Sequence, residues 1–253
     1  MKKESEIALG IREVLCKLVD YYAKEKKHKK SDKGVVQGRS VAAASVFQLD
    51  FARWLFRLLG KGRILVDYPV SFGEYITESG KKRKRTCYAD IMMLEEGPDS
   101  EVLRAIMELK IDLGFLRCTY YGLEKENGRY VYKGQSTFKD NYRVLLESHL
   151  FTYKWPVGFD GSEIRHVAVP QAGKNVIKVC LVVTEDNAHG RFEAFRESME
   201  DAGFRFICLL PRKIHPNEHV TKDENLNKWK IETKRKIRSA VNDEETARVF
   251  KGL

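Results

Sequence analysis

The spacing of apolar and polar positions along the chain predicts a regular succession of helices and strands. Apolar residues recur three and four positions apart in five segments, which predicts helices at 4–23, 40–59, 136–150, 191–201 and 225–240. Short apolar runs predict core strands at 64–76, 174–184 and 204–210, and two more within 87–112. Helix, three meandering strands, helix, strand, helix and strand follow one another in this order. The order predicts an α/β fold with a mixed central sheet flanked by helices.

Turn residues separate these elements and indicate how they connect. The segment 96–99 (EGPD) predicts a tight turn between the two strands of 87–112. Asn127-Gly128 between tyrosine-rich runs predicts an inserted hairpin over 117–134. The segment 151–174 contains repeated proline and glycine and is predicted to be a loop. Strand, helix and strand over 174–210 predict a parallel pair joined by a crossover.

Helix ends and strand irregularities are also predicted. Ser40 is a candidate N-cap of the second helix, and Gly60 is its predicted stop. In the first core strand, Pro69 and Gly73 indicate an edge position or a bulge.

Three regions are expected along the chain. Residues 1–39 form an N-terminal helix and a basic linker packed on the core, residues 40–212 form the core, and residues 213–253 form a basic helical tail. The tail helix places lysines and arginines around a narrow apolar line of Trp229, Thr233 and Ile237. Two arrangements fit this pattern: the helix lies along a nucleic-acid duplex, or it docks on the protein as a solubilising last helix.

Composition narrows the classes of function. The 253 residues are 43% hydrophobic, which indicates a globular protein, and the formal net charge of +10 suggests a polyanionic partner. Five scattered cysteines lack the paired spacing of a zinc site and are expected to be reduced thiols of a cytoplasmic protein. We expect no signal peptide and no membrane partner, because the N-terminus is charged and no apolar run is long enough to span a bilayer. P-loop and nucleophile-elbow motifs are missing from the sequence.

Two acids and a lysine occupy chemically demanding positions in the two strands of 87–112. Asp90 lies in the first strand, and Glu108-Leu109-Lys110 ends the second. Charged groups at the end of an apolar strand are costly to bury unless they are paired or used. Two nearby carboxylates suit Mg²⁺, which prefers oxygen ligands, and a bound metal ion polarises a phosphate and activates water. Lys110 would orient that water or stabilise the developing charge.

This pattern resembles the PD-(D/E)xK nuclease superfamily, in which an Asp on one strand precedes an ExK motif on the next. The 18 residues between Asp90 and Glu108 fit a hairpin, although Ala89 stands where the family name has proline. The resemblance covers 40–210 by element order and implies a restriction-endonuclease-like sheet. It also implies Mg²⁺, or Mn²⁺ in its place, held by Asp90, Glu108 and the carbonyl of Leu109. In that superfamily a helix before the first core strand often adds a polar group to the site, and Gln48 is preferred here over Asp50.

Other cations are candidates for phosphate contacts. Residues Lys81, Lys82, Arg83, Lys84 and Arg85 form a run at a hairpin tip that leads into the strand of Asp90. Lys139 and Arg143 lie one turn apart on the helix that follows the ExK strand. For each group the alternative is an ordinary solvated surface.

The leading hypothesis from sequence is a Mg²⁺-dependent nuclease, specifically an endonuclease acting on DNA. A catalytically inactive nucleic-acid-binding module of the same fold is a second hypothesis. A protein-interaction subunit of a larger defence, repair or transposition complex is a third. A homodimer is compatible with each, because two related sites most simply cut two antiparallel strands.

Overall fold

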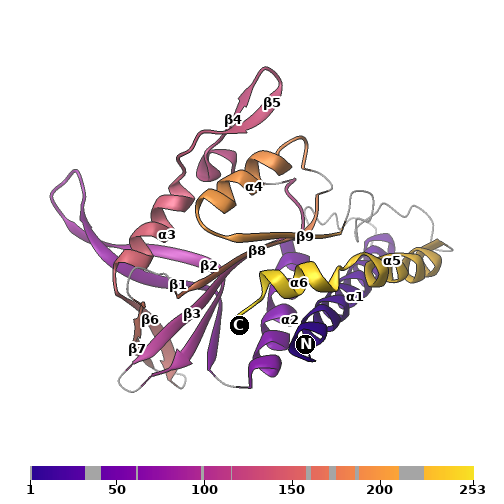
Figure 1. The fold of residues 1–253 in the computed structure, drawn as a ribbon, viewed down its shortest axis with the longest axis horizontal. Coiled ribbons are helices and arrows are strands. Elements are labelled where there is room, and N and C mark those ends of the chain that lie inside the picture. Colours follow the sequence, from indigo (N-terminus) through magenta and orange to yellow (C-terminus); the bar gives the residue numbers. More distant parts are fainter. Residues whose placement is uncertain are drawn as a thin grey trace.

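The computed structural model describes residues 2–31, 41–60, 62–97, 100–114, 116–157, 161–170, 175–185, 188–210 and 225–253. The helices are α1 (Lys2–Ser31), α2 (Val41–Leu59), η1 (Cys118–Tyr121, a 3₁₀ turn), α3 (Thr137–Glu147), α4 (Phe192–Asp201), α5 (Leu226–Ala240) and α6 (Asp243–Val249). The strands are β1 (Arg63–Ile76), β2 (Lys82–Glu96), β3 (Glu101–Lys110), β4 (Leu123–Glu126), β5 (Arg129–Tyr132), β6 (Leu150–Val157), β7 (Gly161–Ala168), β8 (Ile177–Thr184) and β9 (Arg205–Leu210). Figure 1 shows their arrangement.

The large sheet is mixed and partly closed on itself. Its strand order is β2-β1-β6-β7-β3-β8-β9, and β2 also pairs with β3. The strands β1, β2, β3, β7 and β6 therefore form a ring, and β8 and β9 continue from β3 as parallel neighbours. The pairing of β1 with β6, through Ser71 and Phe72, closes this ring.

Side chains alternate between the two faces of the strands and contribute to two hydrophobic cores, one on each side of the sheet. In β3, Met107 and Leu109 join the core built with α1, α2, α5 and α6. Ile106, which precedes Met107 on the strand, joins the core built with α3, α4 and η1. This period of two is what a strand buried on both faces requires. The end of β3 thus lies between two helical layers.

Most of the predicted architecture is confirmed. The mixed central sheet with flanking helices is present, and β8 and β9 are a parallel pair. The 117–134 hairpin turns at Asn127-Gly128, Gly60 ends α2 with a positive φ, and a bulge lies at Gly73. Ser136 caps α3 by accepting a hydrogen bond from the backbone of Lys139. The proposed cap Ser40 lies outside the described residues.

One prediction was wrong: the segment 151–174 is not a loop. It contains most of β6 and all of β7, which pair antiparallel from Leu150–Ala168 to Val157–Gly161. Phe151, Tyr153 and Val167 point into the core at strand spacing. Pro156 lies near the end of β6 and Gly161 begins β7, positions at which a missing donor or a missing side chain costs little.

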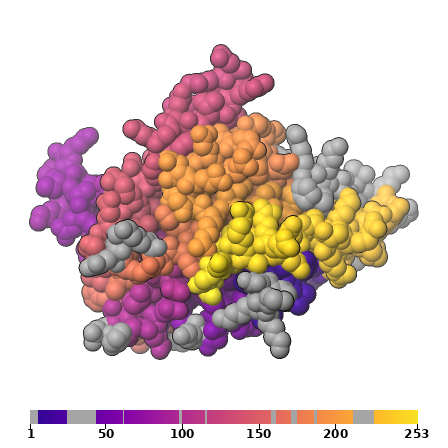
Figure 2. Space-filling view, viewed as in Figure 1, coloured from indigo at the N-terminus to yellow at the C-terminus, as the bar shows by residue number. Residues whose placement is uncertain are grey.

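The basic tail helix is docked on the N-terminal helix. Its apolar line of Trp229, Thr233 and Ile237 is buried against the α1 side of the molecule. Both Lys230 and Lys234 place their ammonium groups 2.7 Å from the carboxylate of Asp20 on α1. The described residues thus follow the docked arrangement, and Figure 2 shows α5 and α6 forming one continuous surface beside the body of the protein.

Candidate active site

The antiparallel pairing of β2 with β3 brings the two predicted acids together. Ile91 pairs with Met107, so the register places Asp90 opposite Glu108 in the next row. Neighbouring strands lie about 5 Å apart, which keeps two side chains of one row within reach of a shared cation.

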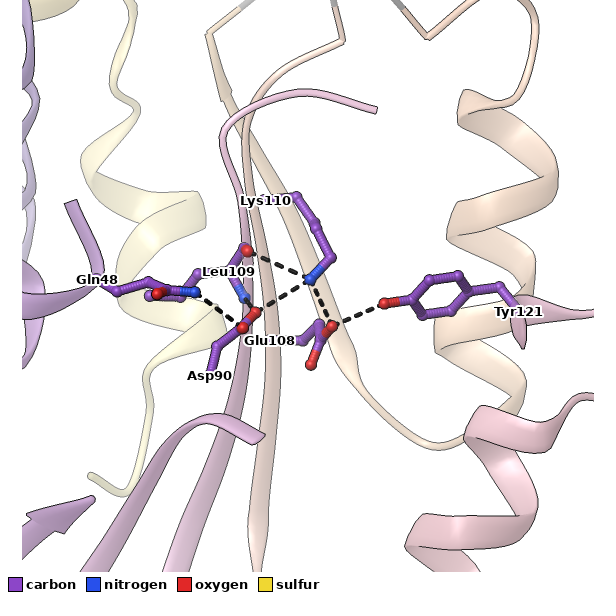
Figure 3. A network of polar contacts seen from close by, with 6 residues as sticks. All are labelled: Gln48, Asp90, Glu108, Leu109, Lys110 and Tyr121. Atoms are coloured by element: carbon purple, nitrogen blue, oxygen red, sulfur yellow. Dashed lines mark hydrogen bonds and ion pairs between the residues drawn. The ribbon is translucent and has the colours of Figure 1, made fainter. Parts of the chain in front are cut away.

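The ammonium of Lys110 is the point at which three oxygen atoms meet. It lies 3.1 Å from Oδ2 of Asp90 and 2.5 Å from Oε1 of Glu108. It also lies 3.4 Å from the carbonyl oxygen of Leu109. These are the three groups that the sequence nominated as metal ligands, and Figure 3 shows them around this one nitrogen.

Further hydrogen bonds from both helical layers fix the two carboxylates. Gln48 on α2 donates from Nε2 to Oδ1 of Asp90 at 2.9 Å, and the backbone N–H of Leu109 donates to Oδ2 at 2.7 Å. On the opposite side, the hydroxyl of Tyr121 donates to Oε1 of Glu108 at 2.8 Å. Figure 3 shows Gln48 and Tyr121 approaching from opposite sides of the strands. Each acid is therefore held by a hydrogen-bond donor of its own as well as by the ammonium that the two share.

Burial makes this site electrostatically demanding. Glu108 is only 5% exposed, and burial and then the charge of Asp90 raise the pKa of its carboxyl, although Lys110 and Tyr121 act against this. Burial alone would lower the pKa of Lys110, but Glu108, Tyr121 and Asp90 raise it well above its usual value. The neighbouring oxygen atoms thus favour the charged form of Lys110. Two carboxylates and one ammonium leave an excess of negative charge, which favours a further cation.

The donor set fits a hard divalent ion. Two carboxylates and one backbone carbonyl are oxygen ligands of the kind that Mg²⁺ binds through a few protein groups while it keeps several waters. Across the described residues, no group of three or more His, Cys, Asp or Glu side chains is placed to hold a metal. A metal site here would therefore use the Leu109 carbonyl and exchange the ammonium of Lys110 for the ion.

Asp67 is a third acid beside this pair, and the sequence reasoning did not single it out. Val66 pairs with Ile91 and Tyr68 with Ala89, so the register of β1 places Asp67 opposite Asp90. Its backbone φ is +46°, a conformation uncommon for residues other than glycine. Partial burial and then the charge of Asp90 raise the pKa of Asp67. One row of the sheet thus carries three acids on three adjacent strands.

The other predicted phosphate contacts lie apart from the acids. Lys82 to Arg85 belong to the exposed end of β2, with Lys81 in the turn before it. Arg85 is five residues from Asp90, roughly 16 Å along a strand. The hairpin bearing these cations projects from the body of the molecule (Figure 1).

Lys139 and Arg143 of α3 are engaged in intramolecular ion pairs. Lys139 bridges to Asp201 of α4 at 2.5 Å. Arg143 lies 3.5 Å from Asp140 and 3.7 Å from Glu147 on its own helix. Their contribution to binding nucleic acid stays a prediction.

Tyr121 was the second residue missed by sequence reasoning. It was counted among the aromatic residues of the inserted hairpin, but it ends η1 and is buried against Phe138 and Phe195. This packing places the hydroxyl of Tyr121 within hydrogen-bonding distance of Glu108. A tyrosine in an aromatic cluster gives no sign in the sequence of which acid it will meet.

Comparisons with protein-family models, curated proteins and solved structures give no match, so the geometry of the site carries the evidence on its chemistry. In the described part of the chain, no helix has both the length and the apolar character needed to cross a membrane.

Proposed function

We propose that this protein is a metal-dependent nuclease that hydrolyses phosphodiester bonds, most simply a DNA endonuclease of the PD-(D/E)xK type. The observation that carries the proposal is the convergence of Asp90, Glu108 and the Leu109 carbonyl on a single cationic position. The lysine that fills this position comes from the same strand as Glu108. Acid pair and lysine are thus held at contact distance at the end of a rigid sheet.

Asp90, Glu108 and the Leu109 carbonyl would hold Mg²⁺ or Mn²⁺. When bound, such an ion supplies polarisation of the scissile phosphate and a lower pKa for a coordinated water. Lys110 contributes its fixed positive charge, which stabilises the negative charge that develops on the phosphate oxygens. In this proposal Lys110 acts through this charge and through its hydrogen bonds to the two carboxylates.

Gln48 and Tyr121 are positioning residues in this proposal. Gln48 holds one oxygen of Asp90 and leaves the other directed toward Lys110. Tyr121 restrains Glu108 by its hydrogen bond and acts against the burial that raises the pKa of this carboxyl. A carboxylate kept ionised and fixed in direction binds a cation with less reorganisation.

The formal charge of +10 and the exposed cations of the β1–β2 hairpin support a nucleic-acid partner. Phosphate contacts of this kind add affinity without sequence preference. A cytoplasmic site of action is part of the proposal.

The test is incubation of the full chain with supercoiled plasmid and with short oligonucleotides, in Mg²⁺, Mn²⁺ or EDTA. We expect cleavage with either ion and none with EDTA. Asp90→Asn should abolish it, whereas Asp201→Asn, which alters an exposed acid paired with Lys139, should not. Absence of cleavage under every ion, with DNA affinity retained, would favour the inactive binding module instead.

A further inference from the structure

A groove lies between α2 and the first half of β1, next to the proposed active site. It encloses about 750 Å³, within the range of about 300–1,000 Å³ typical of ligand sites. Its lining combines cations with aromatic rings: Lys17, Arg53, Arg57, Arg63, Phe56 and Trp155. We call it the α2–β1 groove.

The groove begins beside the acids on both of the elements that form it. On α2, the lining residue Leu49 follows Gln48, whose side chain holds Asp90. On β1, the lining residue Val66 pairs with Ile91, the neighbour of Asp90. From there the groove extends to Arg57 on the helix, a span of about 12 Å at 1.5 Å per residue. At about 3.4 Å per nucleotide, the spacing of a stacked strand, this span accommodates up to roughly three nucleotides of one strand.

Positive charge in the groove exceeds negative charge. Among the described residues that line the groove, Asp50 is the one acid, and it lies 3.7 Å from Arg53. Arg63 is held by Glu101 at 2.9 Å. Within the described residues, no ion-pair partner is found for Lys17 or Arg57, and both are exposed. Two cations are therefore available to neutralise phosphates.

Flat apolar surface lies between these charges. Phe56 is 48% exposed and Leu49 is 43% exposed, although both belong to a helix whose opposite side is fully buried. The guanidinium of Arg63 covers the ring of Trp155 at 4.2 Å from its centroid. An exposed aromatic ring can stack on a base, and a cation beside it can pair with a phosphate. Proteins that bind single-stranded nucleic acid combine these two kinds of contact. In a duplex the bases stack on one another, so the faces that Phe56 would contact are covered.

We infer that the α2–β1 groove binds an unpaired DNA strand adjacent to the acids, with bases on Phe56 and phosphates at Lys17 and Arg57. The inference rests on the proposed nuclease function and specifies its substrate class. The substrate has single-stranded DNA on one side of the scissile phosphate, as in a flap, a gap, a frayed end or a free single strand.

The test is fluorescence anisotropy of the full chain with a labelled single-stranded oligonucleotide and with the duplex of the same sequence, both in EDTA. Removing the metal separates binding from cleavage. The parent should bind the single strand more tightly than the duplex. Phe56→Ala should weaken single-strand binding about tenfold or more, with duplex binding changed far less. Arg57→Gln should reduce the slope of log affinity against log salt by about one unit.

Two matched controls are available on exposed surface away from the groove. Ile231→Ala removes a comparably exposed apolar side chain from α5, and Arg129→Gln removes an exposed cation from the inserted hairpin. Both should bind the single strand like the parent. Circular dichroism melting should show all four variants folded, since each altered side chain is exposed.

Equal affinity for single strand and duplex, or unchanged single-strand binding by Phe56→Ala and Arg57→Gln, would overturn the inference. A dimeric parent that becomes monomeric on Phe56→Ala would also overturn it and assign the groove to a second copy of the chain. Cleavage by the parent alongside either result would leave the nuclease proposal intact. Groove-dependent binding without any cleavage would remove the nuclease proposal and keep the groove as a binding site.

Discussion

Lys110 has two roles in this account. Its positive charge compensates two buried carboxylates, and it also faces the position proposed for the substrate. Its contacts with Asp90 and Glu108 are 3.1 and 2.5 Å long. Removing one partner of a buried ion pair commonly costs about 3–5 kcal/mol, since the remaining charge loses its compensation. A second cation in the same position would replace that compensation.

We therefore predict that Lys110→Met lowers the melting temperature of the metal-free protein and that Mg²⁺ or Mn²⁺ restores most of the loss. The added ion should stabilise the variant more than the parent, because in the parent it must displace an ammonium. Differential scanning calorimetry with and without the ion measures both effects. The matched control is Lys178→Met on the neighbouring strand β8, where the ammonium donates to the carbonyl of Ala202. An ion-independent loss in Lys110→Met would contradict a shared metal and lysine position.

We predict that Asp67 lowers the thermal stability of the metal-free protein. Asp67→Asn removes a carboxylate opposite Asp90 and keeps a residue type that tolerates positive φ. The melting temperature should rise by about 1–3 °C, the effect of a few tenths to one kcal/mol in a chain of this size. Calorimetric titration with Mn²⁺ should show weaker binding by the variant. A destabilised variant would show that Asp67 has a structural partner in place of this electrostatic role.

At the scale of elements, the docking of α5 on α1 depends on a charged contact. Burial alone would raise the pKa of Asp20, but hydrogen bonds from Lys230 and Lys234 lower it below its ordinary value of 3.8. A carboxylate with a depressed pKa stabilises the folded state above its unfolded pKa, and this stabilisation is lost as the pH falls through the folded value. The contact therefore contributes at neutral pH and fades below 3.8.

We predict that Asp20→Asn melts below the parent at neutral pH and that the difference shrinks as the pH falls below 3.8. Hydrogen exchange of α5 amides should be faster in the variant at neutral pH. Glu193→Gln, which alters an exposed ion pair within α4, serves as the control and should show little effect at any pH. A difference that grows toward acid would contradict the assignment.

The contact between α1 and α2 is a second element-scale constraint. A Cβ built on Gly10 would lie 1.7 Å from Nε1 of Trp54, so the two helices meet where only glycine fits. Gly10→Ala should lower the free energy of unfolding by about 1–3 kcal/mol or more, measured by urea denaturation. Gly161→Ala is the control, because within the described part of the chain its Cβ would meet the Val157 carbonyl alone, at 3.8 Å. A neutral Gly10→Ala would mean that the helices separate at little cost.

At the scale of the whole molecule, local sequence patterns predicted most helices and strands but did not predict every strand pairing. Apolar periodicity and turn residues located α1 to α5, the β2–β3 pair and the β8–β9 pair, because these signals lie within short windows of sequence, whereas the short helix α6 was not predicted. The strands β6 and β7 were missed, since Pro156 and the nearby glycines dominated a segment whose burial is set by distant β1 and β3. Ring closure is a long-range property that no local window contains.

In the candidate site, too, local signals were predictable from the sequence and long-range contacts were not. Asp90, Glu108 and Lys110 were predictable because charged residues interrupt apolar strands, and Gln48 because it borders the buried stripe of its helix. Gln48 nevertheless meets Asp90 across 42 positions and Tyr121 meets Glu108 across 13, through packing of opposite helical layers. Asp67 was missed because its importance follows from the register of β1 against β2.

The most direct test of the central claim is the single-turnover rate of DNA cleavage by Lys110→Met in saturating Mg²⁺, compared with the parent and Lys178→Met. Measured on folded, metal-loaded protein, the rate reports charge stabilisation and not the stability effect of the same substitution. The account predicts that Lys110→Met loses about 100-fold or more in rate with DNA affinity retained, that Lys110→Arg recovers little, and that Lys178→Met cleaves like the parent. Cleavage by Lys110→Met at the parental rate would contradict the account and reduce Glu108-Leu109-Lys110 to a structural ion pair.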